Sequence, residues 1–350
     1  MTKDELLQHI KDNNTIQNST LNDLDLSNMD LSGVRFKDVV FNDVDFSSAK
    51  ITKTGFKGSV FNNCSFNNVN LKELFWQKLS FLSCSFIKAN ISESTFNNVD
   101  FSNSNFNGAD LSKSTFFESV LDETSFQETN CTKTTFSMSK MGGAVFLDMD
   151  LLSVIFFKTD MEGTKFINTN LKKCVLMECD LKEQNFSGMN LNMVQFNKSD
   201  LSQGDFTGAD ISKSNFIGCD LTSCIFKDVL ARNTIFTQAT LKLNDFTDTN
   251  LYQCNFDEAQ IERCDFSNAN IEQTHFEKAY IKNTTFNNVN AKYANFNHAV
   301  FEKVYLRGAD LTYATIHRTK FDETKLDEAE CFGIKKTDPE LLEAEEFIYE

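Results

Sequence analysis

The chain has 350 residues but only one proline, one tryptophan and 13 glycines, and nowhere do 18 apolar residues follow one another. Without such a run we predict no membrane-spanning helix, and the charged first twenty residues do not resemble a secretory signal. Basic residues are also few: 34 Lys and Arg stand against 50 Asp and Glu, for a net charge of −16. Because phosphate binding depends on Lys and Arg, we expect no direct binding of nucleic acid.

Motifs of catalysis and cofactor binding are lacking as well. The sequence contains no P-loop, GxGxxG, GxSxG or HExxH pattern, and its ten cysteines form no zinc-type CxxC pair. His275, His298 and His317 recur at intervals of about 20 residues, but at different places in the repeat described below. We therefore interpret them as solvated surface side chains rather than as a metal-ligand set, and we predict no enzyme, no cofactor and no metal.

A five-residue repeat organises most of the chain. From Leu21 to Cys331 every fifth residue is apolar, and thirty-one of the 36 phenylalanines occupy this position, which we call the centre of each pentad. A five-residue step advances about 140° around an α-helix and reaches alternate faces of a strand, so neither element keeps the centres on one side. The chain must therefore change direction in every pentad and coil around a core formed by the centres.

The kinds of centre indicate four pentads per coil. Centres whose numbers end in 6 are Phe in 25 of 27 cases from Phe36 to Phe296, whereas those ending in 1 are mostly Leu or Ile. With four pentads per coil, each kind of centre stays on its own sides of the coil. With three pentads per coil, both kinds would occur on every side. The six remaining Phe centres also share one phase of a 20-residue period: Phe41, Phe61, Phe81, Phe101, Phe301 and Phe321. We predict an all-β, four-sided parallel β-helix of about 16 coils, with Phe facing Phe across one diameter.

These pentads resemble the pentapeptide-repeat family, whose pattern is a small residue, Asn or Asp, Leu or Phe, and two polar residues. Ala109-Asp110-Leu111-Ser112-Lys113 and Ala209-Asp210-Ile211-Ser212-Lys213 match it directly. The resemblance covers residues 19–333 and implies a right-handed quadrilateral β-helix. The chain departs from the pattern in favouring Phe and in accepting Thr or Val two residues before the centre.

The ends of the chain are predicted to be helical. Residues 1–18 contain a capping-box spacing at Thr2 and Glu5, and we expect a helical cap over residues 2–12. Residues 19–333 form the β-helix. In residues 334–350, Asp338 and Pro339 predict a helix start, and the following apolar residues predict a capping or dimerisation helix. The candidate dimer contacts are Leu341, Leu342, Phe347 and Ile348.

All ten cysteines occupy inward positions of the pentads, and we predict free thiols buried in the core. Cys64 and Cys84 lie one coil apart, so an oxidised pair between them is left open. Free thiols together with the absent signal predict a cytoplasmic location. Export without a cleaved signal remains an alternative.

Two features of the outer surface are candidate binding sites for a protein partner. Two adjacent sides of the coil are acidic; the candidate acidic residues are Asp122, Glu123, Asp160, Glu162, Asp245 and Asp248. A third side carries outward apolar residues, which we call the apolar stripe: Phe117, Met138, Ile155, Phe157, Val175, Met177, Ile217 and Ile235. Solubility and simple packing are the alternative interpretations of these two features.

From these features we predict a non-enzymatic scaffold that binds protein partners through the apolar stripe and the two acidic faces, and that also forms a homodimer. The alternative comes from the resemblance, because acidic members of the family mimic DNA and bind type II topoisomerases such as DNA gyrase. Duplex DNA carries one charge per about 1.7 Å. The acidic faces carry a much lower charge density, so the scaffold is favoured.

Overall fold

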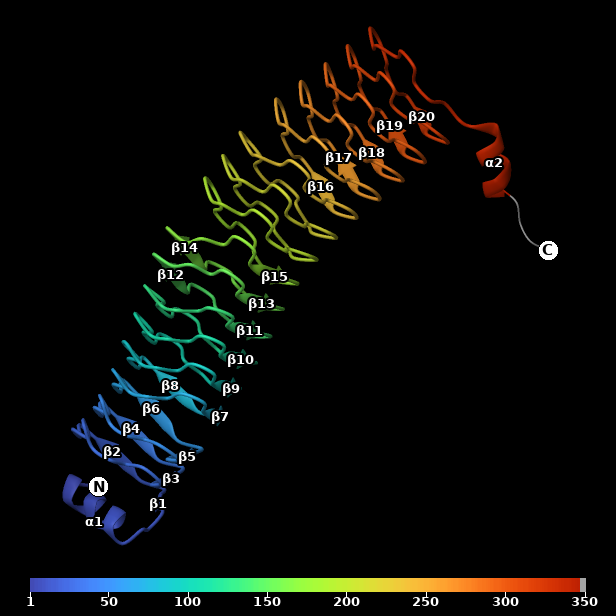
Figure 1. Cartoon of the computed structure of the whole chain (residues 1–350). Coiled ribbons are helices and arrows are strands. Elements are labelled where there is room, and N and C mark those ends of the chain that lie inside the picture. The colour runs from blue at the N-terminus through green and yellow to red at the C-terminus, as the bar shows by residue number, and fades with distance from the viewer. Residues whose placement is uncertain (347–350) are drawn as a thin grey trace. The chain divides into compact units, whose positions relative to one another are not determined.

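The computed structural model describes residues 1–346, and the chain divides into two compact units, Met1–Asn170 and Leu171–Glu350. It is an all-β parallel solenoid of about 15 turns with short helices at both ends, which confirms the predicted fold class. Helix α1 (Lys3–Lys11) belongs to the first unit and α2 (Pro339–Glu346) to the second (Figure 1).

Short parallel strands follow one another along the coils of the first unit. Their partners lie 20 residues apart, as in the pairing of Phe116 with Phe136, so four pentads complete one turn. The pairing orders are β1-β3-β5, β2-β4-β6-β8, β7-β9-β10-β11-β13 and β12-β14. The strands are β1 (Ile16–Gln17), β2 (Thr20–Asn22), β3 (Arg35–Lys37), β4 (Val40–Asn42), β5 (Gly55–Lys57), β6 (Val60–Asn62), β7 (Phe75–Gln77), β8 (Ser80–Leu82), β9 (Thr95–Asn97), β10 (Thr115–Phe117), β11 (Thr135–Ser137), β12 (Val145–Leu147), β13 (Ile155–Phe157) and β14 (Lys165–Ile167).

The second unit keeps the same register with fewer strands. Strands β16 to β20 form one parallel ladder in chain order, and single-residue bridges such as Asp180 to Asp200 continue the 20-residue spacing elsewhere. Its strands are β15 (Val175–Met177), β16 (Thr240–Lys242), β17 (Gln260–Glu262), β18 (Tyr280–Lys282), β19 (Val300–Glu302) and β20 (Lys320–Asp322).

A tight turn at each corner explains how the chain changes direction. The residue two after the centre has a positive φ in every pentad from Asn18 to Gly333, between 45° and 78°. In a typical corner, Ser48 has φ of 57° and the Ala49 amide donates to the Phe46 carbonyl at 2.9 Å. A hydrogen bond that spans a residue of positive φ in the third position defines a type II turn. Other corners have a different hydrogen bond, as at Ser119, whose amide donates to the Ser139 hydroxyl at 3.2 Å. The positive φ that all these pentads share converts the five-residue period into a square coil.

Hydrogen bonds explain the polar positions of the repeat. The Asp110 carboxylate accepts from the Ser112 amide at 3.0 Å, and Asp210 does the same for Ser212 at 2.9 Å. Asn or Asp before the centre therefore stabilises the turn that follows. Thr two residues before the centre is inward but satisfied, since the Thr134 hydroxyl donates to the Leu111 carbonyl at 2.8 Å. This explains how a close-packed core accepts Thr at that position.

The phenylalanine centres form stacked columns within each unit. Phe46 stacks on Phe66 of the next coil at 4.8 Å between ring centroids, and it meets Phe56 edge to face at 6.4 Å. In the second unit, Phe226 stacks on Phe246 at 4.8 Å and meets Phe236 edge to face at 6.3 Å. Both arrangements are the favourable ones for aromatic pairs. They confirm the prediction that Phe faces Phe across one diameter.

The two helices differ in how far they cover the coil next to them. Helix α1 has the predicted capping box between Thr2 and Glu5, and it buries Leu6 completely. Helix α2 starts at Pro339 as predicted, but no residue of its described part is buried. Within residues 1–346 the last coil is therefore left open, with the centres Phe321 and Leu326 exposed by 43% and 42%. The described part of α2 does not form the predicted cap.

The cysteines differ from the prediction at one position. None of the ten forms a disulfide, Cys64 and Cys84 included; nine are buried, but Cys331 is exposed. Cys331 is the centre of the last pentad and has no following coil to cover it. The prediction that all ten thiols are buried is therefore wrong for Cys331.

We predict that the native protein presents one readily modified thiol. Burial raises the pKa of Cys219 and Cys254 to about 12, so little of the reactive thiolate forms there near neutral pH. Titration of a dilute, monomeric sample with a thiol-specific chromogenic reagent is expected to detect one fast equivalent before unfolding and ten after it. In Cys331→Ser the fast equivalent is expected to disappear. Several fast equivalents in the native protein would contradict this burial pattern.

Candidate interaction surface

A depression on the first unit gathers four of the predicted acidic residues. It has a volume of about 590 Å³. We call it the acidic depression, and its lining consists of Asp122, Glu123, Asp160, Glu162, Lys140, Lys165, Gly142, Gly143 and Gly163. Its carboxylates outnumber its amines by four to two, so the depression favours cationic groups of a partner.

Glycines create the floor of the acidic depression. Asp122 accepts a hydrogen bond from the Gly142 amide at 2.8 Å, and a Cβ on Gly143 would clash with the Glu123 carboxylate. Gly143 also has φ of 67°, a conformation that L side chains rarely adopt. The carboxylates of one coil thus fold over the bare backbone of the next. These carboxylates could be predicted from the sequence, but the role of the glycines could not.

The predicted apolar stripe of the first unit is exposed but interrupted. Met138 and Ile155 are exposed by 48% and 39%, and Phe117 and Phe157 are half-buried. In the ladder of β10, β11 and β13, Ser137 lies between the two Phe residues. Polar positions therefore separate these four apolar side chains, which do not form a continuous apolar surface.

The apolar stripe and the acidic depression of the first unit lie on neighbouring sides of the same coils. Strand β10 ends at Phe117, and the next side of that coil carries Asp122 five residues later; the same step leads from Phe157 to Glu162. The bridges from Val120 through Lys140 to Asp160 keep these coils in register. An apolar edge and an acidic depression thus adjoin within the first unit.

The other predicted surface residues belong to the second unit. Val175, Met177, Ile217 and Ile235 are all half-buried there, so none of them is strongly exposed. Asp245 and Asp248 lie in that unit too, where Asp245 accepts a hydrogen bond from the Thr247 amide at 2.9 Å. They are not part of the acidic depression.

Several more exposed apolar residues were missed. Phe75 in β7 is exposed by 65%, in the same ladder as Ile155, and a longer count of outward residues on that side would have found it. In the second unit, Ile225, Leu230 and Leu243 are exposed by 49%, 58% and 57%. They stand on different sides of the coil, so a search along one side does not find them.

The predicted dimer contacts are only partly described by the structure. Leu341 of α2 is 46% exposed and Leu342 is half-buried, while Phe347 and Ile348 lie outside the described residues. An apolar recess lies close to them in the open last coil. Its lining is Phe296, Phe301, Leu306, Leu311, Ile316, Phe321, Leu326, Cys331 and Ile334. The exposed apolar surface at this end therefore includes coil centres as well as α2.

Sequence comparisons agree with the repeat geometry. Models of the pentapeptide repeat region match residues 89–166, 149–222 and 259–334, and models of shorter runs of the repeat match 236–279, 19–58 and 40–75. The chain belongs to the pentapeptide-repeat family. A search of curated proteins gave no match to this pentapeptide-repeat chain. Among residues 1–346, no helix is long and apolar enough to cross a membrane.

Solved structures similar to this pentapeptide-repeat chain are distant. HetL, a pentapeptide-repeat protein involved in heterocyst differentiation regulation in Nostoc sp. strain PCC 7120, is 18% identical, with 77% of this chain and 90% of HetL covered and a TM-score of 0.28. QnrB1, a plasmid-mediated fluoroquinolone resistance protein, is 16% identical over 62% of this chain and 91% of QnrB1, with a TM-score of 0.33. The family assignment therefore rests on the sequence models.

Proposed function

We propose that this pentapeptide-repeat chain is a non-enzymatic scaffold that binds a protein partner through the first unit. The observation that carries the proposal is the acidic depression beside the apolar stripe on the same coils. A partner segment with Lys or Arg next to apolar side chains complements both surfaces. The cationic groups would enter the acidic depression, and the apolar groups would contact Phe117, Met138 and Phe157.

The rigidity of the coil favours this role. The backbone of each turn is hydrogen-bonded to the next, as in the donation from the Val120 amide to the Val99 carbonyl at 3.0 Å. Side chains on such a ladder are held in place before a partner arrives, which lowers the entropy lost on binding. The acidic depression and the stripe therefore behave as a preformed surface.

Charge reversal in the acidic depression tests the proposal. We expect short synthetic peptides that combine Arg or Lys with Leu or Phe to bind more tightly than their Glu-substituted counterparts, measured by fluorescence anisotropy. The preference should weaken in high salt, because salt screens surface charges. Asp160→Lys with Glu162→Lys is expected to lower the affinity by about tenfold or more, since it removes complementary charge and adds repulsion.

A matched variant separates the acidic depression from general acidity. Glu128→Lys with Asp148→Lys changes the net charge equally in the same unit but outside the depression, and it should retain most of the peptide affinity. Equal losses in both double variants, or no preference for basic peptides, would contradict a site in the acidic depression.

DNA mimicry is the second candidate, and rows of carboxylates favour it. In the second unit, Asp180, Asp200 and Asp220 bridge from coil to coil in one row. Coils are spaced by about 4.8 Å, whereas duplex DNA carries one charge per about 1.7 Å. Lys182 also contacts Asp180 and Asp200 at 3.3 and 3.4 Å and offsets part of the charge. The row is a weak imitation of a phosphate backbone.

A supercoiling assay distinguishes the two candidates. We expect micromolar protein to leave supercoiling by purified DNA gyrase unchanged. Inhibition that declines in high salt, and in the Asp160→Lys/Glu162→Lys variant, would favour DNA mimicry over the scaffold.

A further inference from the structure

Three side chains with metal-ligand chemistry meet in the second unit. His298 and His317 come from successive coils, and Glu345 comes from the last turn of α2. His298 Nε2 lies 3.3 Å from Glu345 Oε1, and His317 Nε2 lies 3.3 Å from Glu345 Oε2. The two imidazole rings meet edge to face at 5.3 Å between centroids. Their ligand atoms all lie within 4.8 Å of one another.

We propose that His298, His317 and Glu345 bind one divalent transition-metal ion of the zinc class. Tetrahedral Zn²⁺ holds nitrogen and oxygen ligands at about 2.0–2.2 Å, which separates the ligand atoms by about 3.3–3.5 Å. Each histidine already lies at this separation from one oxygen of Glu345, His298 from Oε1 and His317 from Oε2. To hold a single ion, the two imidazoles have to approach each other, and the carboxylate has to bind through both oxygens or turn one oxygen toward both rings.

The ligand set selects the class of metal. Two imidazoles and one carboxylate suit Zn²⁺, Cu²⁺ or Ni²⁺, whereas Mg²⁺ and Ca²⁺ prefer oxygen ligands alone. Partial burial acts to raise the pKa of Glu345, but hydrogen bonds from His317 and Arg318 outweigh it and lower the pKa. The carboxylate is therefore ionised near neutral pH and available as a ligand.

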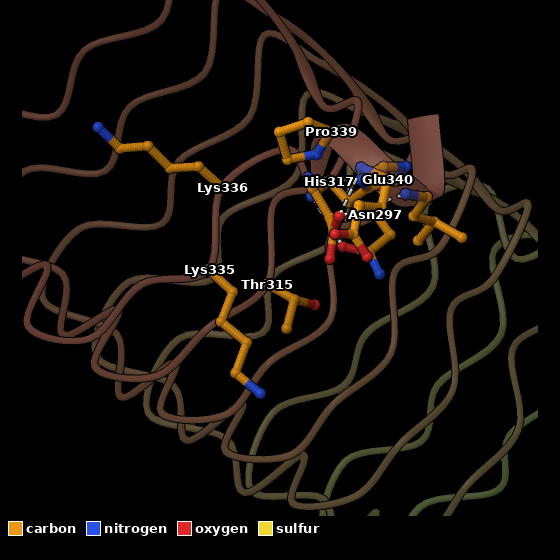
Figure 2. A pocket seen from close by; sticks show the side chains of 9 residues that line it. Asn297, Thr315, His317, Lys335, Lys336, Pro339 and Glu340 are labelled. Atoms are coloured by element: carbon orange, nitrogen blue, oxygen red, sulfur yellow. Dashed lines mark hydrogen bonds between the residues drawn. The ribbon is translucent and has the colours of Figure 1, made fainter. Parts of the chain in front are cut away.

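A pocket beside α2 reaches His317, one of the three proposed ligands. His317 itself is only 4% exposed, which corrects the prediction that it is a solvated surface residue. It nevertheless lines a pocket of about 660 Å³ together with Asn297 and Pro339, as Figure 2 shows. Water from this pocket can complete the coordination, because three protein ligands leave one tetrahedral position open.

Metal binding would change the proton on His317. Its Nδ1 accepts a hydrogen bond from the Asp338 amide at 3.1 Å, so in the metal-free protein the neutral ring carries its proton on Nε2. A metal on Nε2 requires that proton to move to Nδ1. The Asp338 amide must then turn away, because two donors cannot pair. Metal binding therefore breaks the hydrogen bond from the Asp338 amide to His317, immediately before α2, and forms a bond between the metal and His317 Nε2.

A guanidinium group occupies part of the metal-free site. Arg318 Nη1 lies 3.2 Å from Glu345 Oε2, and Arg318 Nη2 lies 3.4 Å from Glu346 Oε1. A metal would displace the first contact and leave the second in place. Arg318 thus holds the Glu345 carboxylate near the histidines before the ion arrives.

Calorimetric titration of the intact chain with Zn²⁺ tests the site. We expect one saturable site, and about tenfold or weaker binding in His298→Gln and in Glu345→Gln. His275→Gln is the matched control, because His275 is exposed and lies outside the cluster. It should bind Zn²⁺ as the unchanged chain does. No saturable binding, or equal weakening in His275→Gln, would overturn the proposal.

Imidazole ¹⁵N NMR gives a readout that does not depend on folding of the variants. The His317 ring is expected to change from the Nε2-protonated to the Nδ1-protonated tautomer as Zn²⁺ is added. Binding of Zn²⁺ with no change in the His317 tautomer would place the ion elsewhere and refute this site.

Discussion

Phe106→Ala is expected to lower the free energy of unfolding by about 3–5 kcal/mol, the usual cost of truncating a buried phenylalanine. Phe106 is fully buried. Its ring stacks on Phe86 at 5.0 Å and on Phe126 at 5.4 Å, and it meets Phe101 edge to face at 5.3 Å. Truncation removes all three contacts at once. The close-packed coil cannot collapse into the gap, because the backbone of each turn is fixed by its neighbours.

Urea unfolding measures this loss, and Phe75→Ala is the matched control. Phe75 lies in the same unit but is 65% exposed, so the same truncation there should cost less than about 0.5 kcal/mol. Hydrogen exchange should show the Phe106→Ala loss most strongly in the coils that contact Phe106. A similar cost at both positions would contradict the assignment of the Phe column as the core.

The intact chain is expected to be dimeric at tens of micromolar, through the open last coil. Phe321 and Leu326 are centres of pentads, yet they are exposed by 43% and 42%, and Leu341 of α2 is 46% exposed. A second copy of the same end would cover these apolar groups about a two-fold axis. Light scattering is expected to show a dimer for the intact chain and a monomer for Phe321→Asp with Leu326→Asp.

Two further variants identify the contact. Deleting residues 337–350 should also give monomers if α2 contributes to the dimer. Phe117→Asp with Phe157→Asp should leave the dimer intact. Dissociation of that variant would mean that the dimer forms through the apolar stripe instead of the last coil. A monomeric mass for the intact chain would refute a dimer through either surface, the last coil with α2 or the apolar stripe.

The sequence predicts the coil well because one physical constraint recurs in every pentad. Phe106 and Leu111 had to be inward for any coil to form, and a 20-residue pairing followed from the distribution of Phe. The corner turns were harder to predict from the sequence, since residues as different as Ser48, Lys113 and Tyr293 adopt a similar positive φ. Backbone hydrogen bonds, rather than residue type, impose that conformation.

The candidate sites were predictable only where they follow the repeat. Asp122 and Glu162 could be assigned to one acidic side, but the glycine floor between their coils depends on contacts across turns. The metal-ligand cluster was missed because Glu345 lies outside the repeat and reaches His317 only when α2 packs beside the coil. Exposure of Cys331 was missed for a related reason, since a periodic pattern does not show which coil is the last to be covered.

The uniform 20-residue register also limits how this surface can change in evolution. Inserting 20 residues between two coils adds one whole turn, so every later side chain keeps its side and moves along the axis by about 4.8 Å. Inserting five residues rotates all later coils by a quarter turn and transfers each side chain to the neighbouring side. Within the first unit, such an insertion between Glu123 and Gly142 would separate the acidic floor from its carboxylates. Lineages of this chain should therefore lengthen in steps of whole turns.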